Sequence, residues 1–126
     1  MNYKYVIIGA GNGGQSLAGD MVLRGTKVSA IYDKNPKPIE AIRKAGGIQM
    51  SGPVVEGFAP IEHPTARLVD AMEQGNVFLV TIVGNFHAQL AKEMAPYVRE
   101  SDIILLIPGN SGSSLLFRKT LRENGV

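Results

Sequence analysis

Glycines near the amino end of the chain have the spacing Gly-x-Gly-x-x-Gly. They directly follow the short apolar segment Tyr5–Ile8, in the run Gly9-Ala10-Gly11-Asn12-Gly13-Gly14. After a strand, Gly9 permits a tight turn, Gly11 lets a pyrophosphate approach the backbone, and Gly14 lets the next helix pack closely. Unpaired N–H groups at the start of a helix bind phosphate oxygens. The pattern therefore predicts that this run binds the pyrophosphate of a nicotinamide dinucleotide.

An acidic residue stands where a second strand is expected to end. Asp33 follows the segment Lys27–Tyr32, about 20 residues after the last glycine, where dinucleotide-binding sheets place a carboxylate for the ribose hydroxyls. Such a carboxylate repels a 2′-phosphate and so favours NAD(H). Lys34 and Lys37 offer cations for a 2′-phosphate, although a solvated surface is the simpler explanation for both. We therefore expect NAD, with NADP as the alternative.

The ends of the next two predicted strands supply further candidates. Val83-Gly84 ends one strand, and Pro108-Gly109 ends the other. Ligands of open α/β sheets bind outside the carboxyl ends of the strands, so these residues are expected to line the ribose and nicotinamide. Glycine and proline also favour turns, which explains them equally well. Asn12 either fixes the glycine loop or contacts the cofactor.

Other residue types exclude several kinds of site. The chain has no cysteine, which excludes disulfides, thiolate metal sites and cysteine nucleophiles. His63 lies in a loop without a nearby set of ligands, so no metal site is expected. His87 begins a helix and is expected to be exposed rather than to face the nicotinamide. The serines after Gly109 lack the Gly-x-Ser-x-Gly pattern of a hydrolase.

The elements that position these residues alternate between short strands and longer helices. Such alternation predicts a parallel sheet with helices on both faces. We therefore expect a Rossmann-type, doubly wound α/β domain over residues 1–126. The expected strands are Tyr5–Ile8, Lys27–Tyr32, Val77–Val83 and Ile103–Ile107, and all but Lys27–Tyr32 are expected to be buried.

Helix and turn signals separate these strands. Gly25 closes the helix after the glycine loop, and a second helix begins at Asn35-Pro36 and stops at Gly46-Gly47. The alternation within Ile48–Ile61 suggests a hairpin or two short extended pieces. A short helix over Thr65–Glu73 is expected to take Thr65 as its cap. The buried stripe of a later helix is expected to be Phe86, Leu90 and Met94, and that of the last helix Leu115, Leu116 and Leu121.

Composition and charge are those of an ordinary globular domain. The 126 residues carry a net charge of +2, too small to indicate nucleic-acid or membrane binding. The apolar run at the amino end is too short for a signal peptide, and no stretch approaches the ~20 apolar residues of a membrane span. We expect a cytoplasmic protein. The abrupt end after a helix suggests a piece of a longer protein, whose exposed edge strand invites a homodimer.

Several short segments, taken with the glycine loop, are typical of one enzyme family. They are Ala18-Gly19-Asp20, Leu23-Arg24-Gly25, Gly46-Gly47-Ile48, Met94-Ala95-Pro96-Tyr97, and Pro108-Gly109 with Gly112. Together they resemble the amino-terminal NAD(P)-binding domain of the octopine and nopaline (opine) dehydrogenases. The resemblance spans nearly the whole chain. Its most specific part is the Gly-Asn-Gly-Gly form of the loop.

The resemblance implies an activity. Opine dehydrogenases condense the amino group of an amino acid with an α-keto acid and reduce the imine with NAD(P)H. Their catalytic histidine and its neighbouring acid lie in a carboxyl-terminal helical domain. No position here matches them, so this chain is expected to bind cofactor without turnover. Two alternatives stay open: a stand-alone NAD(H)-binding or sensing module, and the cofactor domain of a ketopantoate or β-hydroxyacid reductase.

Overall fold

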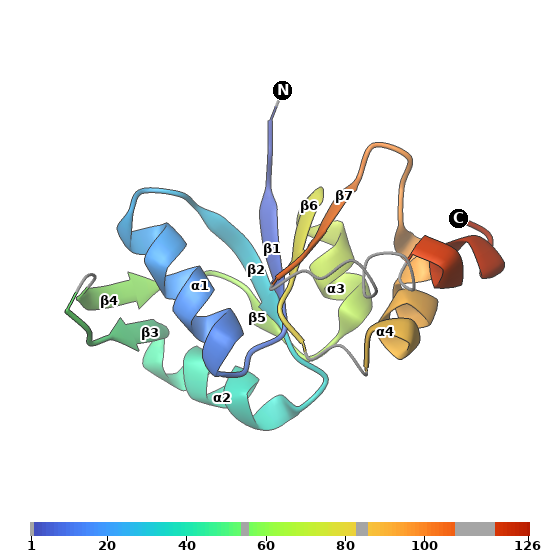
Figure 1. The fold of residues 1–126 in the computed structure, drawn as a ribbon. Helices are drawn as coiled ribbons and strands as arrows, with labels where there is room; N and C mark the ends of the chain where they lie inside the picture. Colours follow the sequence, from blue (N-terminus) through green and yellow to red (C-terminus); the bar gives the residue numbers. More distant parts are fainter. Residues whose placement is uncertain (1, 54–55, 83–85, 108–117) are drawn as a thin grey trace.

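Five parallel strands form the main sheet, in the order β5-β2-β1-β6-β7 (Figure 1). The computed structural model describes residues 2–53, 56–82, 86–107 and 118–126. From β1 the chain builds the sheet outward to one edge, then returns to build the other side, as in a doubly wound sheet. The predicted Rossmann-type fold is therefore confirmed. The strands are β1 (Tyr5–Ile8), β2 (Val28–Tyr32), β5 (Pro64–Thr65), β6 (Val77–Val80) and β7 (Ile103–Leu106).

Helices cover both faces of the sheet (Figure 1). Successive residues of a strand point to opposite faces, so β1 buries Ile7 on one side and Val6 and Ile8 on the other. The two central strands β1 and β6 are built from apolar and aromatic residues because helices cover both of their faces. On the Ile7 side lie α1 (Asn12–Leu23) and α2 (Pro36–Ala45), and on the opposite side lie α3 (Leu68–Glu73), α4 (His87–Met94) and the short 3-10 helix η2 (Ala95–Tyr97).

Local signals fix the ends of α2 as the sequence predicts. The side chain of Asn35 accepts a hydrogen bond of 3.1 Å from the backbone N–H two residues later. Pro36 takes the first helical position, where its missing N–H leaves no intrahelical bond unmade. Gly46 ends the helix with a left-handed φ of 80°, which glycine adopts without strain. The helix then buries Ile39 and Ile42.

An antiparallel hairpin packs against α1, outside the main sheet (Figure 1). Its strands are β3 (Gly47–Met50) and β4 (Gly57–Pro60), so the predicted hairpin is confirmed. Gly19 of α1 permits this close approach, because a Cβ at that position would overlap the sulfur of Met50. The hairpin thus supports the helix that follows the glycine loop.

Helix α3 and strand β6 have bounds that differ from the sequence predictions. Helix α3 begins at Leu68, and Thr65 lies in β5 instead, paired with β2. The Thr65 hydroxyl still accepts a bond of 3.1 Å from the N–H of Arg67, just before the helix. Pairing with the sheet has therefore displaced the helix start. Strand β6 ends at Val80, and the predicted end at Val83 lies outside the described residues.

Strand β7 is less buried than predicted, because it forms an edge of the sheet (Figure 1). Ile104 and Leu106 pack on the side of α4, as does Leu121 from a helical stretch at residues 118–123. Ile103 and Leu105 point the other way and are 39% and 48% exposed. The prediction of a fully buried strand is therefore wrong. Leu115 and Leu116 of the last predicted helix lie outside the described residues.

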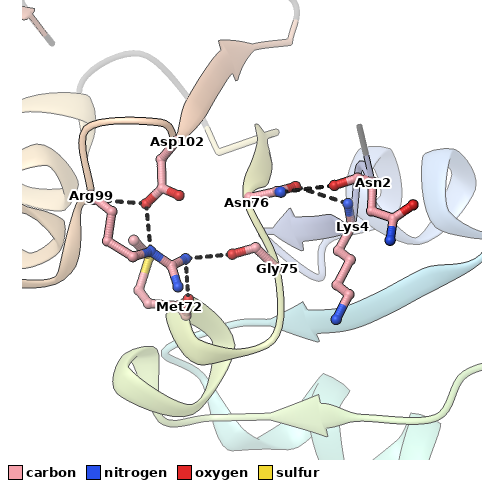
Figure 2. Close-up of polar contacts among 7 residues, drawn as sticks. All are labelled: Asn2, Lys4, Met72, Gly75, Asn76, Arg99 and Asp102. Atoms are coloured by element: carbon pink, nitrogen blue, oxygen red, sulfur yellow. Dashed lines mark hydrogen bonds and ion pairs between the residues drawn. The ribbon is translucent and has the colours of Figure 1, made fainter.

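A polar network ties together the amino ends of β1, β6 and β7 (Figure 2). The glycine loop follows the other, carboxyl end of β1. Asn76 accepts a bond of 2.8 Å from the N–H of Lys4, which links the starts of β6 and β1. The guanidinium of Arg99 donates to the carbonyl of Gly75 and pairs with Asp102 at 3.2 Å. The side chain of Asp102 is 1% exposed, so its charge depends on Arg99 for compensation. These bonds join the starts of β1 and β6 to the segment before β7.

Candidate dinucleotide-binding site

The glycine loop leaves the carboxyl end of β1, at the centre of the sheet. From β1 the chain passes through α1 to β2 on one side, while β6 pairs with β1 on the other. Such a reversal opens a crevice outside the strand ends, where open α/β sheets bind ligands. Hydrogen bonds join the loop here to Asp33 at the end of β2 and to Thr81 after β6.

Gly9 and Gly14 are required by the local packing. Gly9 has a φ of 117°, which side chains rarely adopt, and its N–H donates to the carbonyl of Tyr32 at 2.7 Å. Gly14 is buried, and a Cβ there would overlap the carbonyl oxygen of Gly9 and lie 2.8 Å from Oγ1 of Thr81. The tight turn and the close helix packing predicted for these two glycines are therefore present.

Gly11 and Gly13 face open space instead. A Cβ at either position would meet no heavy atom within 4 Å. Gly11 is the N-cap of α1, and Asn12 is the first helical residue. The first turn contains no acidic side chain, and its N–H groups have no intrahelical acceptor. The helix start is therefore an open, positively polarised surface of the kind that binds phosphate.

Asp33 has a structural role that sequence reasoning missed. One carboxylate oxygen accepts the N–H of Ala10 at 2.8 Å, and the other accepts the N–H of Asn35 at 2.8 Å. Asp33 thus ties the glycine loop to the end of β2. A carboxylate offers about four lone-pair sites, so the two bonds leave capacity for further donors. The side chain is half-buried, which keeps it accessible from the crevice.

Thr81 holds the glycine loop from the other side. Its hydroxyl donates to the carbonyls of Ile8 at 3.1 Å and Gly9 at 3.3 Å, and its N–H also bonds Ile8. Sequence reasoning did not select Thr81, although its place at the end of a strand beside β1 is a usable signal. It fixes the turn from which α1 begins.

We expect Thr81→Val to lower the free energy of unfolding by about 1 kcal/mol. Valine has nearly the same shape as threonine but has no hydroxyl to donate to the half-buried carbonyls of Ile8 and Gly9. Urea unfolding measures the change. Thr81→Ser keeps the hydroxyl and is the matched control, expected to lie closer to the parent chain. Equal stability of the valine and parent chains would show that the hydroxyl does not hold the loop.

A cavity of about 240 Å³ opens beside the loop, between the ends of β1 and β2 and helix α4. Its floor is apolar and its rim is charged, as suits a flat base carrying a polar sugar. Phe86 was predicted in the buried stripe of α4 but precedes that helix, is 57% exposed, and lines this cavity. The floor includes Ile8, Tyr32 and Leu90, and the rim includes Asp33, Lys34 and Glu93.

The charges at the cavity act on the phenol in its floor. Burial raises the pKa of Tyr32, and the carboxylates of Glu93 and Asp33 raise that pKa further. The phenol therefore stays protonated at neutral pH and keeps its O–H as a donor. Glu93 lies on α4, far from the glycine loop in sequence, and sequence reasoning did not identify it.

Neither histidine lines the cavity beside the glycine loop. His87 is 2% exposed, and its Nε2 lies 3.0 Å from the carbonyl oxygen of Ile82. The predicted exposed position is therefore wrong: the ring is buried at the start of α4. His63 contributes its carbonyl to the sheet, accepting the N–H of Ile31 at 3.2 Å. Within the described ranges, no three histidine or acidic side chains gather as a metal site would require.

Four of the residues predicted to contact the cofactor are not among those that the structure describes. Val83, Gly84, Pro108 and Gly109 lie outside the described residues. The predicted site is thus described on the side of the pyrophosphate and the adenosine ribose. That side brings together the glycine loop, Asp33 and the cavity.

Sequence comparison identifies the family. Residues 4–107 match the family described as NADP oxidoreductase, coenzyme F420-dependent. The chain belongs to this family. Among its curated relatives is the opine dehydrogenase of Arthrobacter sp. (strain 1C), to which the chain is 36% identical over 122 residues. The match covers 97% of this chain and 34% of that protein. It is 31% identical over 125 residues to protein ocs of Agrobacterium tumefaciens (strain Ach5), covering 94% and 33%.

The relationship to opine dehydrogenase predicted from the sequence is thus confirmed, and the chain spans about a third of the length of these relatives. Solved structures of the oxidoreductases share its fold. An octopine dehydrogenase in complex with NADH and agmatine superposes with a TM-score of 0.77 at 23% identity, over 98% of this chain and 32% of that one. Prephenate dehydrogenase from A. aeolicus, in complex with hydroxyphenyl propionate and NAD⁺, gives 0.74 at 16% identity, over 96% and 39%.

Proposed function

We propose that the chain binds NAD(H) and forms the cofactor-binding part of an opine-dehydrogenase-like oxidoreductase. The observation that carries this proposal is the contrast among the loop glycines. Gly9 and Gly14 are explained by packing, whereas Gly11 and Gly13 keep the start of α1 open without any packing need. An open helix start suits a pyrophosphate. The half-buried carboxylate of Asp33 and the adjacent cavity fit the adenosine that such a pyrophosphate carries.

Each part of the site has a distinct task in this proposal. The first turn of α1 binds the pyrophosphate through backbone N–H groups, and Asp33 accepts hydrogen bonds from the ribose hydroxyls. When bound, the nicotinamide supplies or accepts a hydride. Val83, Gly84, Pro108 and Gly109 remain predicted contacts on the nicotinamide side. The chain's own residues bind and orient the cofactor, and we propose that this segment alone does not turn over substrate.

The substrates of the whole protein are part of the proposal. Octopine dehydrogenase has been solved with NADH and L-arginine and with NADH and pyruvate. By analogy, we propose an amino acid and an α-keto acid, joined as an imine that the reduced cofactor reduces. No helix in the described parts of the chain has the length and apolar character to cross a membrane. A cytoplasmic location and a homodimer remain predictions.

The deciding experiment is a fluorescence titration of NADH, and separately of NADPH, into the chain. We expect saturable NADH binding in the ~μM to mM range, with NADPH weaker. Asp33→Asn should weaken NADH binding about tenfold, because a charge-assisted hydrogen bond to the ribose becomes a neutral one. Thermal unfolding of the variant checks that the loop stays folded. Failure of both dinucleotides to saturate would contradict the proposed function.

A further inference from the structure

Two oppositely charged side chains meet across the cavity beside the glycine loop. Lys34 follows the end of β2, and Glu93 lies on α4, on the opposite wall. The ammonium nitrogen of Lys34 is 3.5 Å from Oε1 of Glu93. The same oxygen accepts a bond of 2.9 Å from Nε2 of Gln89, one helical turn earlier. Glu93 is thus held in place by its own helix, and Lys34 reaches over to it.

The two members of this pair differ in burial. The side chain of Glu93 is 29% exposed, whereas that of Lys34 is 79% exposed. A pair this exposed adds little to folding stability, so its main consequence is the charge at the rim. Asp33 lies on the same rim and is fixed by the N–H groups of Ala10 and Asn35. The rim therefore carries two carboxylates and one cation, and that cation is already paired.

This arrangement matters for one difference between cofactors. NADP(H) differs from NAD(H) by a 2′-phosphate on the adenosine ribose, and that group needs a cation to bind. We propose that Glu93 is a specificity-determining residue that favours NAD(H), by pairing Lys34 and by placing a second carboxylate opposite Asp33. The inference rests on the proposed function and deepens it. It assigns the discrimination to α4 as well as to the end of β2.

Glu93→Gln tests the proposal while leaving the shape of the cavity nearly unchanged. Glutamine keeps an oxygen that can accept from Gln89, so α4 should stay intact. Without the negative charge, Lys34 becomes available to a 2′-phosphate. We expect the ratio of the NADPH to the NADH dissociation constant to fall about tenfold, equivalent to about 1.4 kcal/mol. Fluorescence titration at constant ionic strength measures both constants, because screening changes charge effects.

Two further variants separate the pair from general charge effects. In the double variant Glu93→Gln/Lys34→Ala, most of the gain for NADPH should disappear, since the freed cation is absent. Glu62→Gln breaks another lysine pair, in which Lys27 Nζ lies 3.1 Å from Oε2, at a distance from this cavity. That control should leave the ratio unchanged.

The outcomes distinguish this inference from the proposed function. An unchanged ratio in Glu93→Gln overturns the inference, and so does an equal weakening of both dinucleotides, which would place Glu93 against the adenosine that they share. In either case, NADH binding by the parent chain still supports the proposed function. If neither dinucleotide binds the parent chain, the proposed function fails and the inference fails with it.

Discussion

Replacing Gly14 with alanine is expected to lower the free energy of unfolding by about 3 kcal/mol or more, or to prevent folding, because the new methyl group has no space. The Cβ would overlap the carbonyl oxygen of Gly9, and that oxygen belongs to backbone held by Thr81. Backbone cannot move aside as the end of a flexible side chain can. Relief of the overlap would require α1 to move away from β1, which would open the core around Ala18.

Gly13→Ala is the matched control for this prediction. The same methyl group, one residue earlier in the same helix, meets no heavy atom within 4 Å. Alanine favours a helix over glycine, so this variant is expected to be as stable as the parent or up to about 1 kcal/mol more stable. Urea unfolding followed by far-UV circular dichroism compares the two. A Gly14→Ala chain as stable as the Gly13→Ala chain would show that α1 does not pack this closely on β1.

Local signals are enough to predict much of the fold. The cap at Asn35, the stop at Gly46 and the hairpin over Ile48–Ile61 each depend on residues close together in the chain, and all three are present. The glycine loop is predictable for the same reason, because strand, turn and helix follow one another directly. Exposure is harder to predict. A run of apolar residues such as Ile103–Ile107 indicates a strand but not that the strand lies at an edge.

The contacts that complete the site depend on distant pairs. Thr81 reaches the glycine loop because β6 pairs with β1, and Glu93 faces Lys34 because α4 covers the end of β2. The strand end at Thr81 is a usable signal, but its pairing with the glycine loop depends on the sheet, and no local pattern marks Glu93. The burial of His87 is of the same kind, because its ring bonds the carbonyl of Ile82 within the packed start of α4. Sequence reasoning therefore finds the glycine loop and misses the residues that hold it and line the adjacent cavity.

Gly11→Val is expected to keep the fold and to weaken NADH binding about 100-fold or more, equivalent to about 2.7 kcal/mol. The fold should survive because a Cβ at Gly11 meets no heavy atom within 4 Å, and its φ of −77° with ψ of −169° suits valine. Valine is a poorer N-cap than glycine, at a cost of less than about 1 kcal/mol. Binding should weaken because the branched side chain would occupy the space over the first N–H groups of α1.

The contrast with Gly14→Ala makes the Gly11→Val result specific to the ligand. One variant removes the packing of α1 and should lose stability, whereas the other removes access to the helix start and should lose affinity. Urea unfolding and NADH titration give the stability and the NADH affinity of both variants. If the loop were only structural, Gly11→Val would not lose affinity while keeping its stability. If Gly11→Val bound NADH as tightly as the parent, the pyrophosphate would not lie on this loop, and the open helix start would need another explanation.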